Sequence, residues 1–168
     1  MTDKISIRPA EASDLLAIAE IQVQSWRETY TNILPQAVIE SRTVESRLAM
    51  WTSIFGKPGQ HLWVGVHEDR VCAFVSAGPG RSEVDGDAGE IYAIYALRSC
   101  HGLGIGSALF RQAQNCLRED GHETAVLTVL SNNPTVEFYG RMGGKISREI
   151  QADFGGKQLD ELVMRFEL

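Results

Sequence analysis

The sequence lacks three features that would each point to a special environment: a long hydrophobic run, a cysteine framework and an excess of basic residues. No apolar run approaches the roughly 18 residues of a membrane span, and the segment Met1–Ala10 lacks the apolar core of a secretory signal. Cys72, Cys100 and Cys116 are widely spaced and odd in number, which argues against disulfide bonds. The net charge of -6 disfavours nucleic acid and anionic membranes as partners. We therefore expect a cytoplasmic protein.

What the sequence does contain is typical of one globular domain spanning residues 1–168. Hydrophobic periodicity, glycines and prolines predict the order strand, two helices, three strands, helix, strand, helix, two strands. The predicted helices span 14–26, 44–55, 104–120 and 134–142, and the predicted strands span 5–9, 61–67, 71–77, 90–97, 124–130, 145–151 and 158–166. This order predicts an α/β fold with a mixed central sheet of six to seven strands flanked by about four helices.

The most informative stretch is a glycine-rich loop between a predicted strand and a predicted helix. Gly102, Gly104 and Gly106 stand at every second position there. Glycine lets the backbone approach a ligand closely, and the first N–H groups of a helix have no partner within it. Such a loop predicts a phosphate or diphosphate site. The alternative is a turn that merely joins strand to helix.

Other phosphate-binding motifs fit this loop poorly. A Walker A loop needs Gly-Lys-Ser/Thr, but Gly106 is followed by Ser107-Ala108. A dinucleotide fingerprint needs a later third glycine and an acid after the next strand, which here ends in Leu130-Ser131-Asn132. Both motifs therefore match weakly, and a dinucleotide oxidoreductase stays as a further hypothesis that predicts binding of a nicotinamide or flavin cofactor. The histidines and cysteines show no metal-ligand spacing, so we also expect no metal.

Two segments carry a resemblance to a known family. Residues 90–109 resemble motif A of the GNAT superfamily, whose loop reads Q/R-x-x-G-x-G/A, and residues 133–144 resemble its motif B, with Asn133, Phe138-Tyr139 and a closing glycine pair. The sequence departs from the family pattern with His101 in place of Gln or Arg, and with Val136 where alanine is frequent. With the matching element order, the resemblance covers nearly the whole chain. It implies the GNAT fold and an N-acetyltransferase with acetyl-coenzyme A (acetyl-CoA) as donor cosubstrate.

The resemblance also implies where the donor binds. The pantetheine arm would lie along a strand, and the diphosphate would lie over the loop and the helix start. The residues implied for donor binding are Ile94, Tyr95, Ala96, His101, Gly102, Leu103, Gly104, Ile105, Gly106, Ser107 and Asn133.

Catalytic roles are implied for two residues. Tyr139 is the predicted general acid, because family members place the motif-B tyrosine beside the sulfur; the alternative is an aromatic core pair with Phe138. Glu90 is the predicted general base, because some members use a carboxylate there; the alternative is a solvated acid at a strand end. Tyr92 lies on the same strand face as Glu90 and is predicted to line the acceptor site.

The acceptor side is less specified by the sequence. Trp26 and Tyr30 are four residues apart on one helix face and are predicted to wall the acceptor pocket, with core packing as the alternative. We expect acetyl transfer to a primary amine of a small molecule or peptide, by direct attack in a ternary complex. The acidic net charge favours a cationic acceptor. The alternative function is a non-catalytic acyl-CoA-binding sensor or partner module. The frequency of dimers in the family leaves a homodimer open.

Overall fold

A computed structural model describes residues 4–168, so three residues of the Met1–Ala10 segment lie outside the described part. Within it, seven strands form one mixed sheet in the order β1-β2-β3-β4-β5-β7-β6. In that spatial order they are β1 (Ile5–Pro9), β2 (His61–His67), β3 (Arg70–Pro79), β4 (Gly89–Ala96), β5 (Thr124–Leu130), β7 (Lys157–Glu167) and β6 (Lys145–Phe154). All neighbouring strands are antiparallel except β4 and β5. The predicted α/β class with a mixed sheet is confirmed.

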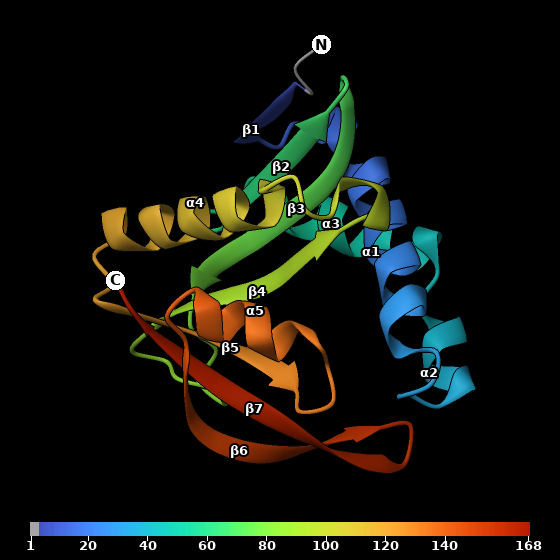
Figure 1. Ribbon diagram of the computed structural model, residues 1–168, viewed down its shortest axis with the longest axis vertical. Coiled ribbons are helices and arrows are strands. Elements are labelled where there is room, and N and C mark those ends of the chain that lie inside the picture. The colour runs from blue at the N-terminus through green and yellow to red at the C-terminus, as the bar shows by residue number, and fades with distance from the viewer. Residues whose placement is uncertain (1–3) are drawn as a thin grey trace.

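Helices cover both faces of this sheet (Figure 1). They are α1 (Leu15–Tyr30), α2 (Gln36–Ser41), α3 (Val44–Ile54), α4 (Ile105–Glu119) and α5 (Thr135–Arg141), with short 3-10 turns at Ala12–Asp14 and Arg98–Cys100. Helix α4 lies on one side of β2, β3 and β4, while α1 and α3 lie on the other (Figure 1). Among the helices of residues 4–168, none combines the length and apolarity that a membrane crossing needs.

Two predictions about the helices were wrong. Helix α2 was not predicted, because it has only six residues and a single buried one, Ile39, which is too little for a periodic signal. Helix α1 was predicted to end at Trp26, but it continues for one more turn to Tyr30, whose buried ring extends its apolar face. Both differences lie in the part of the chain that forms the predicted acceptor side.

Helix α4 is held against the sheet by a dense apolar layer. Its side chains Leu109, Phe110 and Leu117 are completely buried. In β2, a Cβ atom on Gly65 would lie only 2.4 Å from Cγ2 of Ile105, the first residue of α4. The absence of a side chain at Gly65 therefore lets the start of α4 pack directly on the sheet, which fixes the position of the glycine-rich loop before it.

The sheet opens in its middle, between β4 and β5. The two strands pair only at Gly89 with Ala125 and at Glu90 with Val126. Beyond Glu90, β4 keeps its pairing with β3 as far as Ala96 but has no pairing with β5. One edge of β4 is consequently free at the centre of the sheet. A free strand edge is where an extended ligand can add itself through main-chain hydrogen bonds.

Candidate active site

A pocket of about 910 Å³ lies at this opening. Residues of α1, β4, the start of α4, the end of β5 and α5 line it. All the predicted site residues line this pocket apart from Leu103 and Glu90. The structure thus brings together residues that are more than 100 positions apart in the sequence, such as Trp26 and Tyr139.

The glycine-rich loop presents unpaired main-chain donors. Gly102 (φ +78°) and Gly104 (φ +82°) adopt left-handed conformations that favour glycine. Within the described chain, none of the N–H groups of residues 102–107 donates to a protein acceptor, and the first helical bond runs from the Ala108 N–H to the Gly104 carbonyl. A Cβ atom on Gly102 or Gly104 would have no neighbour within 4 Å, so the loop surface is uncovered. This arrangement fits a diphosphate.

The imidazole of His101 lies at the end of the open strand. Its Nε2 is 3.0 Å from the carbonyl oxygen of Ala96, the last residue of β4. The histidine that replaces the family's Gln or Arg therefore contacts the strand along which the pantetheine arm is predicted to bind. The main-chain groups between Ile91 and Tyr95 on the β5 side keep no strand partner.

Tyr139 lies in an aromatic cluster at the wall of the pocket. Its ring centroid is 6.1 Å from that of Phe110 and 5.5 Å from that of Phe138. The side chain is buried, yet it contributes to the pocket surface. Burial raises the pKa of Tyr139 above that of an exposed tyrosine, so its hydroxyl keeps its proton over the whole physiological range. Tyr139 is thus both a core aromatic and a pocket residue.

Glu90 lies behind the pocket surface. It is fully buried, and its Oε2 accepts a hydrogen bond of 2.6 Å from Nε of Arg81. Its Oε1 has no hydrogen-bond partner among the described residues. Burial raises the pKa of Glu90, against the opposing effect of Arg81. Arg81 and Tyr92 line the pocket beside it, and the Tyr92 hydroxyl donates to the Pro79 carbonyl.

Two hydrogen bonds tie helix α1 to the rest of the site. Nε1 of Trp26 donates to the Tyr95 hydroxyl on β4 at 2.8 Å. Nδ2 of Asn133 donates to the Tyr30 hydroxyl at 2.8 Å, while Oδ1 of Asn133 accepts from the Thr135 N–H at the start of α5. Both Trp26 and Tyr30 are buried, and both also line the pocket. Asn133 links motif B to α1, a contact that sequence reasoning did not anticipate.

Sequence reasoning also missed several polar residues of the pocket wall, among them Ser25 and Arg42. Arg42 follows the unpredicted helix α2, and its guanidinium carbon lies 3.8 Å from the centroid of the Trp26 ring. Neither residue belongs to a motif. The only available signal for Ser25 was its position next to Trp26 on a helix face predicted to wall the pocket.

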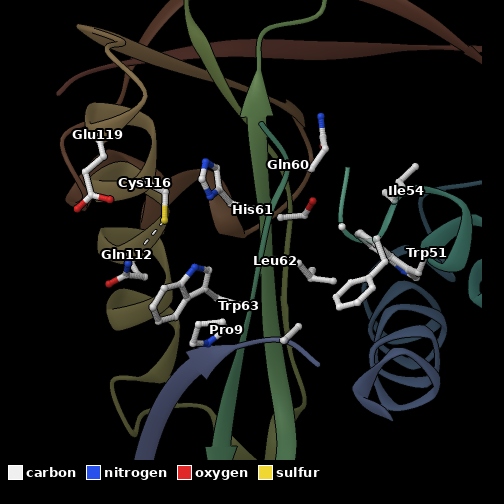
Figure 2. A pocket seen from close by; sticks show the side chains of 14 residues that line it. Pro9, Trp51, Ile54, Gln60, His61, Leu62, Trp63, Gln112, Cys116 and Glu119 are labelled. Carbon is white, nitrogen blue, oxygen red and sulfur yellow. Dashed lines mark hydrogen bonds between the residues drawn. The ribbon is translucent and has the colours of Figure 1, made fainter. Parts of the chain in front are cut away.

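A smaller pocket of about 390 Å³ lies at the beginning of β2 (Figure 2). Gln112 and Cys116 of α4 form one side of it, and Trp51 of α3 forms the other. At its rim, Nε2 of His61 lies 2.6 Å from Oδ2 of Asp120. None of the predicted site residues lines this second pocket. Nowhere in residues 4–168 do three or more histidine, cysteine or acidic side chains gather in a way that would hold a metal.

Comparisons with known proteins bear directly on this site. Residues 16–144 match the model of the acetyltransferase (GNAT) family. The chain is 31% identical over 159 residues to YuaI, an uncharacterised N-acetyltransferase of Bacillus subtilis, covering 94% of this chain and 90% of that protein.

Solved structures share the fold. The PaiA N-acetyltransferase of Thermoplasma acidophilum, solved in complex with coenzyme A, superposes with a TM-score of 0.77 at 20% identity, over 98% of this chain and 99% of that one. YncA of Salmonella typhimurium, solved with acetyl-CoA, gives a TM-score of 0.76 at 21% identity, over 98% and 94% of the two chains. The two structures share the fold of this chain, and the family match together with the sequence relative shows that the chain belongs to the GNAT family of N-acetyltransferases.

Proposed function

We propose that this protein transfers the acetyl group of acetyl-CoA to a primary amine of a small molecule or peptide, by direct attack within a ternary complex. The observation that carries the proposal is the pairing of two features in one pocket. A row of free N–H groups opens α4, and a free strand edge lies beside it. The first suits a diphosphate and the second suits an extended amide-containing arm.

Acetyl-CoA supplies an activated thioester, and residues of this chain would bind the acetyl-CoA molecule. The N–H groups of Gly104, Ile105, Gly106 and Ser107 would bind the diphosphate oxygens. The main chain between Ile91 and Ala96 would bind the pantetheine arm. In the reaction, the amine nitrogen forms a bond to the acetyl carbon while the carbon–sulfur bond breaks. The sulfur must then gain a proton, and the amine must lose one.

We propose that the Tyr139 hydroxyl donates a hydrogen bond to the sulfur atom of the donor. Thiols have a pKa near ~8.5 and exposed phenols near ~10, and burial raises the pKa of Tyr139 further. Complete proton transfer from this phenol to a thiolate is therefore uphill. A hydrogen bond to the sulfur as its charge develops needs no such transfer and stabilises the transition state selectively. Tyr139 then acts as a donor at the leaving group, and solvent completes the protonation.

We propose that Glu90 is the general base that accepts the proton of the amine. A base works best when its pKa lies close to the working pH, and burial raises the pKa of Glu90 in that direction. Because Glu90 does not line the pocket, the proton would reach it through a water molecule beside Arg81 and Tyr92. The unpartnered Oε1 is the oxygen available to accept it.

The test is a thiol-release assay with acetyl-CoA and a panel of primary amines, run beside calorimetric titration with coenzyme A. We expect saturable coenzyme A binding and amine-dependent thiol release. Binding without release for any amine would favour a non-catalytic acyl-CoA-binding module. Absence of binding heat would refute the assignment of the loop and of the open strand.

A further inference from the structure

The pocket contains one partly buried arginine, Arg42, whose charge no carboxylate of residues 4–168 neutralises. Four arginines of the chain are partly buried rather than exposed. Two of them pair with carboxylates: Arg8 with Asp14 at 2.7 Å and Arg165 with Asp85 at 2.8 Å. The other two, Arg42 and Arg47, form no ion pair within residues 4–168. A partly buried cation without an anion loses hydration and lacks the compensation that a paired carboxylate would give.

Arg42 is the member of this pair that lines the pocket. Its guanidinium stacks over Trp26, which orients its plane and recovers part of the lost hydration energy. Burial lowers the pKa of Arg42, and the like charge of Arg47 lowers it further, whereas Tyr95 and Tyr30 oppose this shift. Arg42 remains a cation near Tyr95 and Tyr30, and its guanidinium N–H groups donate to no acceptor within residues 4–168.

The same pocket contains a second side-chain donor without a partner among the described residues, Ser25. The side chain of Ser25, next to Trp26 on α1, is 5% exposed, and its Oγ has no hydrogen-bond partner in the described chain. Ser25 lines the same pocket. A fixed guanidinium and a buried hydroxyl are a donor set that suits a carboxylate, which accepts several hydrogen bonds at once.

The acids of the pocket wall do not supply that carboxylate. Glu28 faces Arg98, with Oε2 3.6 Å from Nε. Glu161 lines the pocket and forms no ion pair with any described residue. The Glu161 carboxylate is therefore free to pair with the ammonium group of a ligand, while Arg42 in the same pocket is free to pair with an anionic group.

We infer that the acceptor is an amine that also carries a carboxylate, such as an amino acid, and that Arg42 and Ser25 bind this carboxylate. The inference rests on the proposed transfer to a primary amine and specifies its substrate class. It adds a negatively charged group to the cationic acceptor that the net charge of the chain favours. A guanidinium binds a carboxylate in a fixed two-pronged geometry, so it would also orient the amine toward the acetyl carbon.

The first test compares acceptors on the unmodified protein. Each amino acid of a panel is assayed beside its primary amide and its decarboxylated amine, with rates corrected to the concentration of free amine. Hydrogen bonds to a charged group contribute enough to give a preference of roughly 10- to 100-fold in kcat/KM for the amino acid. Equal kcat/KM values for amino acid and amide would overturn the inference while leaving the acetyltransferase function intact.

The second test assigns the preference to Arg42. We expect Arg42→Gln to raise KM for the amino acid by roughly 10- to 100-fold and to remove the preference over the amide. Arg42→Lys should recover part of it, because lysine keeps the charge without the fork. The matched control is Arg27→Gln on the exposed face of α1. A preference that survives Arg42→Gln in a folded protein would contradict the inference.

Two further readouts separate this inference from its rivals. Calorimetry should give the same coenzyme A affinity for Arg42→Gln and the unmodified protein; a weakened affinity would mean that the guanidinium serves the donor's phosphates, and the inference would be wrong. Should no amine support turnover, the same amino acid and amide pairs are titrated into the coenzyme A complex. Binding of the amino acid alone would then support carboxylate recognition, and equal binding would refute it.

Discussion

Replacing Tyr139 by phenylalanine isolates the hydroxyl from the packing of its ring. The phenyl group would keep its contacts with Phe110 and Phe138, because only one oxygen is removed from a ring that is 8% exposed. The Thr135 side chain is a hydrogen-bonding neighbour of this hydroxyl. Because Thr135 is exposed, water can replace the oxygen that the substitution removes. We therefore expect Tm to change by no more than a few degrees, which corresponds to about 1 kcal/mol for a domain of this size.

The effect on catalysis should be far larger than the effect on folding. Removing one preorganised hydrogen-bond donor from a site of developing charge lowers kcat by about 10²- to 10³-fold, which is roughly 3 to 4 kcal/mol of transition-state stabilisation. We expect Tyr139→Phe to lower kcat by that factor and to leave KM for both substrates within a few-fold, since the hydroxyl acts when charge develops on sulfur.

Steady-state thiol release, varied in each substrate separately, measures both parameters. A pH profile adds a second check: because burial raises the pKa of Tyr139, its ionisation should produce no descending limb in kcat below about pH 10. An unchanged kcat in the folded phenylalanine variant would remove Tyr139 from the mechanism and leave it as a core aromatic.

Three further predictions concern the frame around the site. In Gly104→Ala a side chain disfavours the left-handed conformation by about 1–2 kcal/mol, so the free loop should relax and coenzyme A binding must restore it. The affinity measured by calorimetry should therefore fall about 5- to 30-fold. The matched control is Gly121→Ala (φ +94°), which follows the other end of α4 and should lower stability without changing the affinity. Gly65→Ala should lower the free energy of unfolding by about 1–3 kcal/mol in urea titrations, because its Cβ would overlap Ile105. The hydrogen bond from Arg8 lowers the pKa of Asp14, so this stabilisation is complete above the unfolded pKa near ~3.9 and disappears as pH falls through the folded pKa. Asp14→Asn should flatten that acid limb of stability; an unchanged limb would contradict the assignment.

The sequence predicted the strands best where apolar periodicity and turn residues agreed. Strands β2 and β5 have the predicted bounds, and the link between β2 and β3 is the tight turn expected, with Glu68 and Asp69 both at positive φ. The glycine-rich loop was predicted for a similar reason, since glycines at alternate positions directly before an amphipathic helix are typical of a turn that binds a phosphate group.

The rest of the site depends on contacts between distant segments, which no local pattern encodes. Arg42 is a pocket residue only because the short helix α2 returns it to Trp26. Asn133 meets Tyr30 across 103 positions of sequence. Glu90 is completely buried and accepts a hydrogen bond from Arg81, which lies in the loop between β3 and β4. Alternation along the strand predicted only on which face of the sheet its side chain lies.

The parting of β4 from β5 has a consequence for how the protein survives in a cell. Only two residue pairs join these strands, so few main-chain hydrogen bonds connect the two halves of the sheet. A molecule bound between β4 and β5 would add contacts to both halves. A ligand present at 100 times its dissociation constant adds about 2.7 kcal/mol to the stability of a fold. Resistance to proteolysis, and the lifetime of the chain, should therefore rise and fall with the supply of its acyl donor.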